Sequence, residues 1–261
     1  MIFLIAIGVI FFHMCLIWVW YLYTKNPSVV DVGWASGLTI IGILYLYSSP
    51  VSSRKILLSI VLLIWGVRVG GYLWFTRIHR HLLDKRYTQL SDNWKISKPL
   101  GFLLNFQLQG VLILIVSLPW YFISQIHSDY FLCAIDYFMI LTALLSIAAE
   151  TIADYQLQSF KALHPGQVCD VGLWFYSRHP NYFFEWLTWC VYACFAFPAS
   201  LGFLAWISPL MLFGIMTRIT APLTENGSIQ SRGGLYLSYQ KVTPMFFPNV
   251  LKKKRHQNLS G

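Results

Sequence analysis

The sequence predicts an all-α integral membrane protein that crosses the bilayer seven times. Of its 261 residues, 57% are apolar and only 11% are charged, and the apolar residues form long runs. A soluble domain typically carries about 25% charged residues. The lipid interior offers the backbone no hydrogen-bond partners, so membrane-crossing segments of this kind are expected to be helices. We expect a single membrane-embedded domain over residues 1–261, of which 251–261 form a basic tail.

Seven stretches reach or approach the roughly 20 apolar residues that a transmembrane helix needs. The first has no basic start and no small-residue cleavage site, so we interpret it as a retained helix and not as a signal peptide. The segment FPASLG supplies a turn between the last two stretches. The expected helices cover residues 1–23, 32–49, 56–76, 100–124, 131–158, 181–200 and 203–221.

The positions of the basic residues indicate the orientation. If the N-terminus lies outside, almost all Lys and Arg fall in inner loops, and the outer loops carry only Arg54 and Lys55. This agrees with the positive-inside rule, so we expect a cytoplasmic C-terminus and a bacterial inner membrane. The net charge of +9 then indicates contact with anionic lipid headgroups and not binding of nucleic acid. The five cysteines form no metal pattern, and we expect no metal.

The stretch ETIADYQLQSFK places acceptors along one face of an expected helix. Glu150, Asp154 and Gln158 are spaced i, i+4 and i+8, and Lys161 follows at the cytoplasmic end. Charged groups at bilayer depth are costly unless they are paired, hydrated or protonated, so they often line a polar cavity. This face could bind ribose hydroxyls and then a phosphate. A polar seam between two helices is the alternative.

The stretch FYSRHPNYFFEWLTW predicts a helix that begins at an anion. Arg178 and His179 precede Pro180, which suits a first helical turn. Free N–H groups at a helix start attract negative charge, and two flanking cations add to that attraction. Asn181 and Glu185, spaced i and i+4, lie deeper along the same helix. We therefore expect the start of this helix to face a phosphate, with the Asn181 amide and the Glu185 carboxylate deeper along the helix.

Two candidates for the substrate side come from the first third of the chain. Asp31 and Trp34 share one face, and a carboxylate beside an indole in an apolar wall would have a raised pKa and could donate a proton. Asp31 could instead only cap its helix. Tyr72 lies one turn after Arg68 in GVRVGGYLWFTR and is the second candidate.

The segment 224–248 is a polar stretch after the last expected span. It could fold back under the cavity and close it on a cofactor, or it could be a surface tail. The side chains concerned are Glu225, Arg232, Tyr236, Tyr239 and Lys241.

Residues 25–250 resemble the DUF1295 group of membrane proteins, which belongs with the steroid 5-alpha-reductase C-terminal superfamily. The matching motifs occur in the same order and are DVGW, GVRVGGYLWFTR, DKRY, ETIADYQLQSFK, LWFYSRHPNYFFEWLTW and SYQKVTPMFFP. The resemblance implies seven transmembrane helices and an NADPH cavity that opens to the cytosol. It also implies reduction of a carbon–carbon double bond conjugated to a carbonyl, in a lipophilic substrate.

The resemblance further assigns residues to the cofactor, and most of them match the family pattern. Glu150 and Lys161 depart from the Asn and Arg that steroid reductases usually have. Arg178 and His179 are expected to neutralise phosphates. The Glu and Tyr that hold the steroid ketone have no clean match, and Asp31 and Tyr72 are the possible stand-ins. The residues that match are Asp154, Tyr176, Asn181, Glu185 and Tyr239.

Two other functions stay open. The element R-H-P-N-Y-x-x-E is also similar to that of membrane methyltransferases for isoprenylcysteine and phospholipids, which bind S-adenosylmethionine. Those enzymes usually have a Gly after the Tyr and a paired-Glu element near the C-terminus, where this chain has Phe183 and the single Glu225. A lipid-binding protein without activity is the third possibility. Membrane lipids are expected partners, and a monomer is compatible with the sequence.

Overall fold

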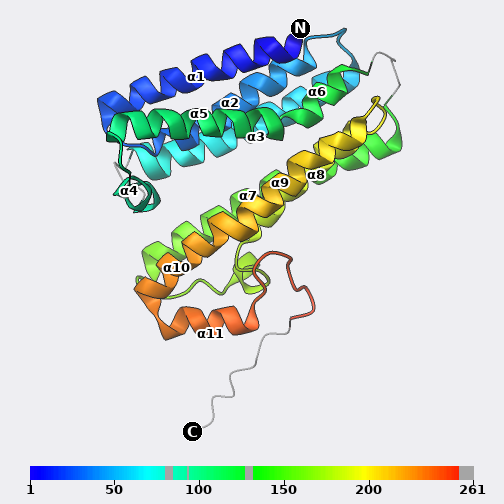
Figure 1. The fold of residues 1–261 in the computed structure, drawn as a ribbon. Coiled ribbons are helices and arrows are strands. Elements are labelled where there is room, and N and C mark those ends of the chain that lie inside the picture. Colours follow the sequence, from blue (N-terminus) through cyan, green and yellow to red (C-terminus); the bar gives the residue numbers. More distant parts are fainter. Residues whose placement is uncertain (80–84, 93, 127–131, 253–261) are drawn as a thin grey trace. The chain divides into compact units, whose positions relative to one another are not determined.

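The computed structural model describes residues 1–79, 85–92, 94–126 and 132–252, and these residues form helices and no strand. Figure 1 shows the helices in sequence colours. The chain divides into two compact units. Unit 1 consists of Met1–Leu145 and Thr188–Leu212, and unit 2 consists of Ser146–Leu187 and Phe213–Gly261. The division cuts through three helices, α7 (Ala134–Leu163), α8 (Pro180–Phe195) and α9 (Ile207–Ile215).

Unit 1 is built around α2 (Val29–Leu46), which packs against α1 (Ile2–Thr24), α3 (Ser53–Leu73) and α5 (Lys98–Val116). Small residues allow this close packing. At Gly42, an added Cβ would lie 2.4 Å from Leu62 Cδ2 and 2.7 Å from Trp120 Cε3. Close approach over small residues is typical of membrane helices, which gain their contact energy from packing.

The fourth expected span is divided into two helices. α5 ends at Val116, and α6 (Leu118–Ser124) follows with Pro119 in its first turn. Proline has no N–H and clashes with the carbonyl of the preceding turn, which explains the interruption.

Four further elements belong wholly or mostly to unit 1. The helix α3 continues into a π-helical turn, η1 (Trp74–His79), and α4 (Lys85–Asp92) follows. After α8, the short η3 (Gly202–Trp206) leads into α9 (Ile207–Ile215).

Unit 2 folds the C-terminal segment back onto the segment before α8. The elements η4 (Met216–Thr220), α10 (Ala221–Arg232) and α11 (Gly234–Val242) come after α9, and Gly233 has a φ of 54° at the turn between the last two. Such a positive φ is accessible to glycine at little cost. The Arg178 N–H donates to the Pro244 carbonyl (2.9 Å), and the Asn249 N–H donates to the Tyr176 carbonyl (2.9 Å). The segment 224–248 is therefore packed in place and is not a free surface tail.

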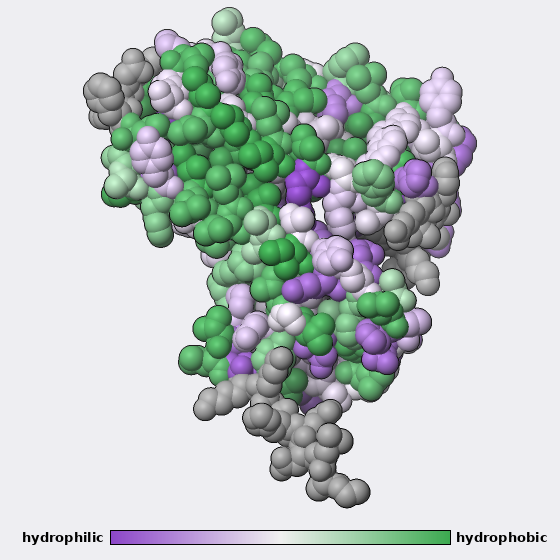
Figure 2. Space-filling model, turned by 180° about the vertical axis from the view of Figure 1, so that it is seen from behind, coloured by the Kyte–Doolittle hydropathy of each residue, from purple (hydrophilic) through white to green (hydrophobic). Residues whose placement is uncertain are grey.

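Six helices in the described part of the chain are long and apolar enough to cross a membrane. Apolar side chains on their outer faces are open, for example Phe11 (58% exposed) and Phe12 (64%). Figure 2 shows one face with a broad area of hydrophobic residues. The all-α membrane fold is thereby confirmed. The helix α8 has 16 residues and is not among the six, so the count of seven and the orientation stay predictions. The six helices span Ile2–Thr24, Val29–Leu46, Ser53–His79, Lys98–Val116, Ala134–Leu163 and Gly202–Arg232.

Candidate functional site

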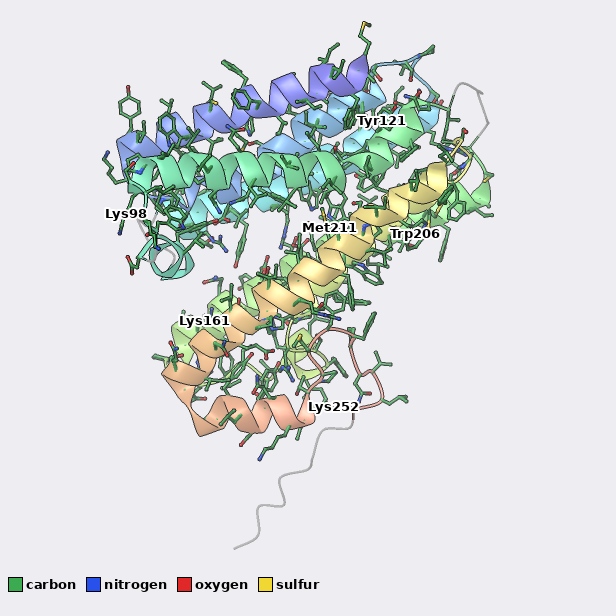
Figure 3. The ribbon with its side chains drawn as sticks, in the orientation of Figure 1. Lys98, Tyr121, Lys161, Trp206, Met211 and Lys252 are labelled. Atoms are coloured by element: carbon green, nitrogen blue, oxygen red, sulfur yellow. The ribbon has the colours of Figure 1, made fainter. Side chains whose placement is uncertain are left out.

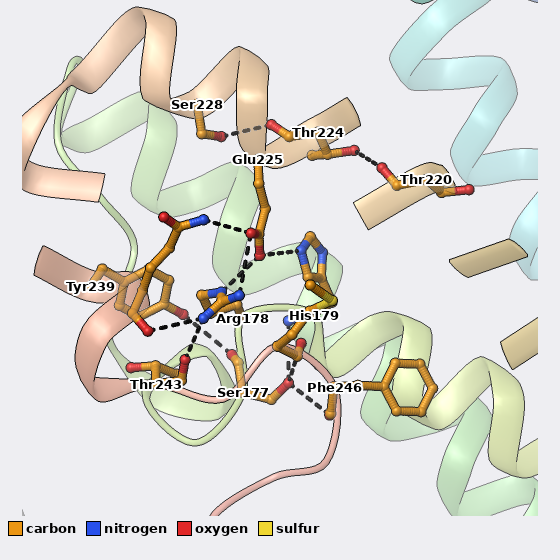
Figure 4. A network of polar contacts seen from close by, with 12 residues as sticks. Ser177, Arg178, His179, Thr220, Thr224, Glu225, Ser228, Tyr239, Thr243 and Phe246 are labelled. Atoms are coloured by element: carbon orange, nitrogen blue, oxygen red, sulfur yellow. Dashed lines mark hydrogen bonds and ion pairs between the residues drawn. The ribbon is translucent and has the colours of Figure 1, made fainter. Parts of the chain in front are cut away.

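A buried ion pair joins the start of α8 to α10. Arg178 and Glu225 contact each other twice, through Nε to Oε1 (2.7 Å) and Nη2 to Oε2 (3.2 Å). Their side chains are only 10% and 6% exposed. Arg178 Nη1 also donates to the carbonyls of Gln240 (3.0 Å) and Thr243 (2.7 Å). Figure 4 shows that this one guanidinium holds α10, the end of α11 and the following loop together.

Two more side chains converge on the same carboxylate. His179 Nε2 lies 3.0 Å from Glu225 Oε1, and Gln240 Nε2 donates to Glu225 Oε2 (2.6 Å). The His179 ring also stacks on Tyr182, with 4.9 Å between the ring centroids. Arg178 and His179 are therefore engaged by Glu225, whereas the sequence predicted them as phosphate ligands. We call the set Arg178, His179, Glu225 and Gln240 the clamp.

Tyr239 is fixed on the other side of the clamp. Its hydroxyl donates to the carbonyls of Trp174 and Ser177. Burial raises the pKa of Tyr239 well above its usual range, and burial likewise raises the pKa of Tyr236. Both phenols consequently remain neutral and add no negative charge at physiological pH.

A pocket of about 120 Å³ lies beside the clamp. The start of α8 contributes Asn181 and Tyr182, α7 contributes Lys161, and α10 contributes Arg232. Figure 3 labels Lys161 near the end of α7. The complete lining is Leu157, Lys161, Gln167, Val168, Cys169, Trp174, Arg178, His179, Asn181, Tyr182, Thr224, Ser228, Arg232, Tyr236 and Tyr239.

The electrostatics of this pocket are one-sided. Three of its lining residues are cationic, Lys161, Arg178 and Arg232, and none is an Asp or Glu. Burial raises the pKa of the Cys169 thiol, so this group also stays neutral. Glu225 already pairs with Arg178, so the remaining cations of the lining are Lys161 and Arg232, and Asp154 behind Asn181 offsets part of the charge of Lys161. The pocket is thus suited to an anion.

The acceptor face of α7 meets α8 in this region. Asn181 Nδ2 donates to Asp154 Oδ1 (3.1 Å), and Asp154 is only 5% exposed. The other amide atom, Asn181 Oδ1, is buried and has no hydrogen-bond partner among the described residues. Glu150 is buried one turn earlier on α7. Asn181 thus lines the pocket with an amide whose oxygen is buried and unpaired within the described part of the chain.

A wider, more open hollow of about 1100 Å³ adjoins the pocket. The two share Gln167, Val168 and Tyr239. Its walls are mainly apolar and include Phe160 and Phe175. Lys252 Nζ donates to the Phe175 carbonyl (2.8 Å) and lies over that ring, 4.2 Å from its centroid. The hollow can therefore accept a flat or apolar group that continues from the pocket.

The structure brings together part of the predicted cofactor set. Lys161, Arg178, His179, Asn181 and Tyr239 line the pocket, and Asp154 contacts it through Asn181. The lining does not include Glu150, Tyr176 or Glu185.

One feature of the site was missed in the sequence, namely Glu225 as the partner of Arg178 and His179. Arg232 was among the side chains of segment 224–248 that the sequence analysis named as able to close the cavity. Its place in the pocket follows a helical spacing, since Thr224, Ser228 and Arg232 recur every four residues and all line the pocket. The same spacing had singled out Glu150 and Asp154 on α7.

The substrate-side candidates lie in unit 1. Asp31 forms an ion pair with Arg77 of η1 and accepts a hydrogen bond from Tyr87 Oη (2.9 Å). It lies in the first turn of α2, and the N-cap position belongs to Ser28. For Tyr72, the guanidinium of Arg68 lies over the ring, 5.6 Å from the centroid. Of the DKRY motif, Asp84 falls outside the described residues, as do 253–261 of the basic tail.

The fold and the site together define the class of this protein. It is a helical membrane protein with a cation-lined pocket at the start of α8. A family model assigns it more narrowly. The model described as "Protein of unknown function (DUF1295)" matches residues 17–243, and the chain belongs to that family. This match confirms the resemblance that the motifs indicated and includes segments of both units. No curated protein and no solved structure matches the chain.

Proposed function

We propose that this protein is a membrane-embedded, NADPH-dependent reductase of a carbon–carbon double bond in a lipophilic enone. The resemblance of its family to the steroid 5-alpha-reductases supplies the reaction class. One observation carries the proposal. The two motifs assigned to the cofactor, on α7 and α8, contact each other through Asp154 and Asn181 beside a positively charged pocket.

The residues present fit such a cofactor in chemistry and in size. A dinucleotide offers phosphates to Lys161 and Arg232, and an amide N–H to the buried acceptor Asn181 Oδ1. The pocket of about 120 Å³ is too small for the whole molecule, since ligand sites usually measure about 300–1,000 Å³. The adjoining hollow supplies the remaining room.

When bound, NADPH would supply a hydride to the carbon beta to the carbonyl. The protein's own residues would hold and orient the cofactor. Asp154 accepts from the Asn181 NH₂ group and so fixes the orientation of that amide. We assign Glu150 to ribose hydroxyls and Glu185, one turn beyond Asn181, to the carboxamide of the nicotinamide. Tyr176 keeps its predicted place near the cofactor as part of this proposal.

Reduction of an enone also needs a proton donor that polarises the carbonyl oxygen. Asp31 accepts from Arg77 and Tyr87, so both of its carboxylate oxygens are already engaged within unit 1. Tyr72 carries a hydroxyl proton at neutral pH and is therefore our candidate donor.

The cofactor assignment is tested by thermal unfolding of the detergent-purified chain with NADPH, NADH or S-adenosylmethionine. Selective binding to the native state raises the free energy of unfolding by about 2.7 kcal/mol at a ligand concentration of 100 Kd, and Tm rises with it. We expect a shift with NADPH. A shift with S-adenosylmethionine alone would indicate that the R-H-P-N-Y segment binds a methyl donor, and it would overturn the reductase proposal. No shift with any of the three would favour a lipid-binding protein without this chemistry.

The donor assignment is tested with Tyr72→Phe, which removes the hydroxyl and keeps the ring beside Arg68. General acid catalysis typically contributes about 10²–10⁴-fold, so kcat at saturating NADPH should fall by at least about 100-fold on a panel of lipophilic enones. Asp31→Asn is the comparison, and we expect it to lower stability more than kcat. If Tyr72→Phe turns over like the wild type and Asp31→Asn does not, the donor is Asp31.

A further inference from the structure

We propose that Arg218 forms a binding site for an anionic lipid. Arg218 lies in the π-helical turn η4, and it lines neither the pocket nor the adjoining hollow. The ligand class is a lipid of the surrounding bilayer that carries a phosphate or a carboxylate group. The site is separate from the proposed cofactor site, and its test does not depend on the reductase reaction.

Arg218 is an isolated cation in an apolar helix. The segment Gly202–Arg232 is one of the six helices that are long and apolar enough to cross a membrane. Between residues 203 and 224, Arg218 is the only Asp, Glu, Lys, Arg or His. If the helix enters the hydrocarbon layer at Gly202, Arg218 lies roughly 24 Å along it, at about 1.5 Å per residue, in a layer about 30 Å thick. A charge at that depth is costly unless it is paired or hydrated.

The described part of the chain supplies no anion for this cation. Arg218 is exposed and makes no hydrogen bond or ion pair with any described residue. Two other arginines of the spanning helices are paired, by contrast, since Arg54 contacts Asp136 (2.8 Å) and Arg77 contacts Asp31. An intramembrane cation without a partner of its own indicates a ligand anion. The planar N–H fork of a guanidinium suits the oxygens of a phosphate or a carboxylate.

The backbone explains why the helix is irregular at this point. Pro222 comes four residues after Arg218, in the first turn of α10, and proline has no N–H to donate to the Arg218 carbonyl. The chain forms a π-helical turn over Met216–Thr220, a pattern in which a carbonyl pairs with the N–H five residues on. The turn therefore accommodates the proline. Such turns are frequent at functional sites, and this one contains the cation.

The surface around Arg218 is apolar and open, as contact with a lipid chain requires. Ile219 is 56% exposed and Leu223 is 47% exposed. Gly214 lies one turn before Arg218, and a Cβ added there would meet no atom within 4 Å. Open apolar surface beside a single cation matches an acyl chain that is joined to an anionic head group. A soluble anion would leave this apolar surface unused, so we assign the site to a lipid.

The experiment measures how lipids stabilise the full-length chain in dodecyl maltoside. Thermal unfolding is followed while dioleoyl phosphatidylglycerol, oleate or dioleoyl phosphatidylcholine is titrated into the micelles, and inorganic phosphate is tested separately. Arg218→Gln should raise the anionic lipid fraction that gives half of the stabilisation by about 10-fold, because one charge-assisted contact is lost. Arg218→Lys keeps the charge but not the fork, and we expect a rise of about threefold.

The matched control is Lys241→Gln. Lys241 is an exposed cation on α11 of the same unit, and it lines neither hollow. This variant should change the half-stabilising lipid fraction by less than about twofold. Without lipid, Arg218→Gln should melt within about 2 °C of the wild type, because an exposed side chain that contacts no partner contributes little to stability. If Arg218→Gln does not fold, Arg218→Lys carries the test.

Each outcome decides the proposal. Loss of the anionic-lipid effect in the Arg218 variants, with the control unchanged, upholds the site, and the more effective of phosphatidylglycerol and oleate then identifies the anionic group. No stabilisation by either anionic lipid, an equal effect of phosphatidylcholine, or equal losses in all variants would overturn it. Stabilisation by inorganic phosphate alone would assign the site to a soluble anion and would overturn it as well. NADPH binding is measured without added lipid, so a failure of either proposal leaves the other intact.

Discussion

Replacing Glu225 by Gln is expected to lower the free energy of unfolding by about 3 kcal/mol. Removing one partner of a buried ion pair leaves an uncompensated charge, which typically costs about 3–5 kcal/mol. Gln keeps some hydrogen bonds to Arg178, so we expect the lower end of that range. The pair is buried, with side chains 10% and 6% exposed, and solvent cannot take the place of the lost carboxylate. For a chain of this size the loss corresponds to a fall in Tm of roughly 6–12 °C.

An exposed ion pair provides the control for this measurement. Asp92 lies 3.3 Å from Lys98, and both side chains are more than half exposed. Exposed pairs contribute about 0–1 kcal/mol, so Asp92→Asn should melt within about 2 °C of the wild type. Thermal melts of the two variants in the same detergent compare directly. If Glu225→Gln melted as the wild type does, the clamp would not stabilise unit 2 and its assignment would be wrong.

Replacing Asn181 by Leu is expected to weaken NADPH binding by about 10-fold. Leucine has a similar volume, but it removes the acceptor Oδ1 and the donor that Asp154 uses. A neutral amide–amide hydrogen bond contributes about 0.5–1.5 kcal/mol, and about 1.4 kcal/mol corresponds to a tenfold change in Kd. Buried Asp154 would lose this partner, so the pocket wall should also become less ordered.

The matched control is Asn105→Leu. Asn105 lies on α5, where its Oδ1 accepts from Gln109 Nε2 (3.0 Å), and it lines neither hollow of unit 2. The same substitution there should change the Kd for NADPH by less than about threefold. Titration of NADPH against thermal stability measures both variants. Unchanged affinity in Asn181→Leu would contradict the role given to this amide.

Much of the fold could be predicted from hydropathy, because a membrane helix is specified by one continuous apolar segment. The first expected span, 1–23, corresponds to α1 at Ile2–Thr24. The division of the fourth span at Pro119 could have been found too, since a proline inside a helix removes a donor. The π-helical turn η1 could not, because its contacts come from distant residues such as Asp31.

What the sequence determined by itself is which side chains share a helix face. A period of 3.6 residues fixes that Glu150 and Asp154 point the same way, and it also groups Ser228 with Arg232. Only the tertiary structure decided which cation of the pocket is paired with a carboxylate. Glu225 is 47 residues from Arg178 in the chain, and no spacing rule connects α10 with the start of α8. Packing brings Glu225 into contact with Arg178 and neutralises it. Lys161 and Arg232 are the other two cations that line the pocket.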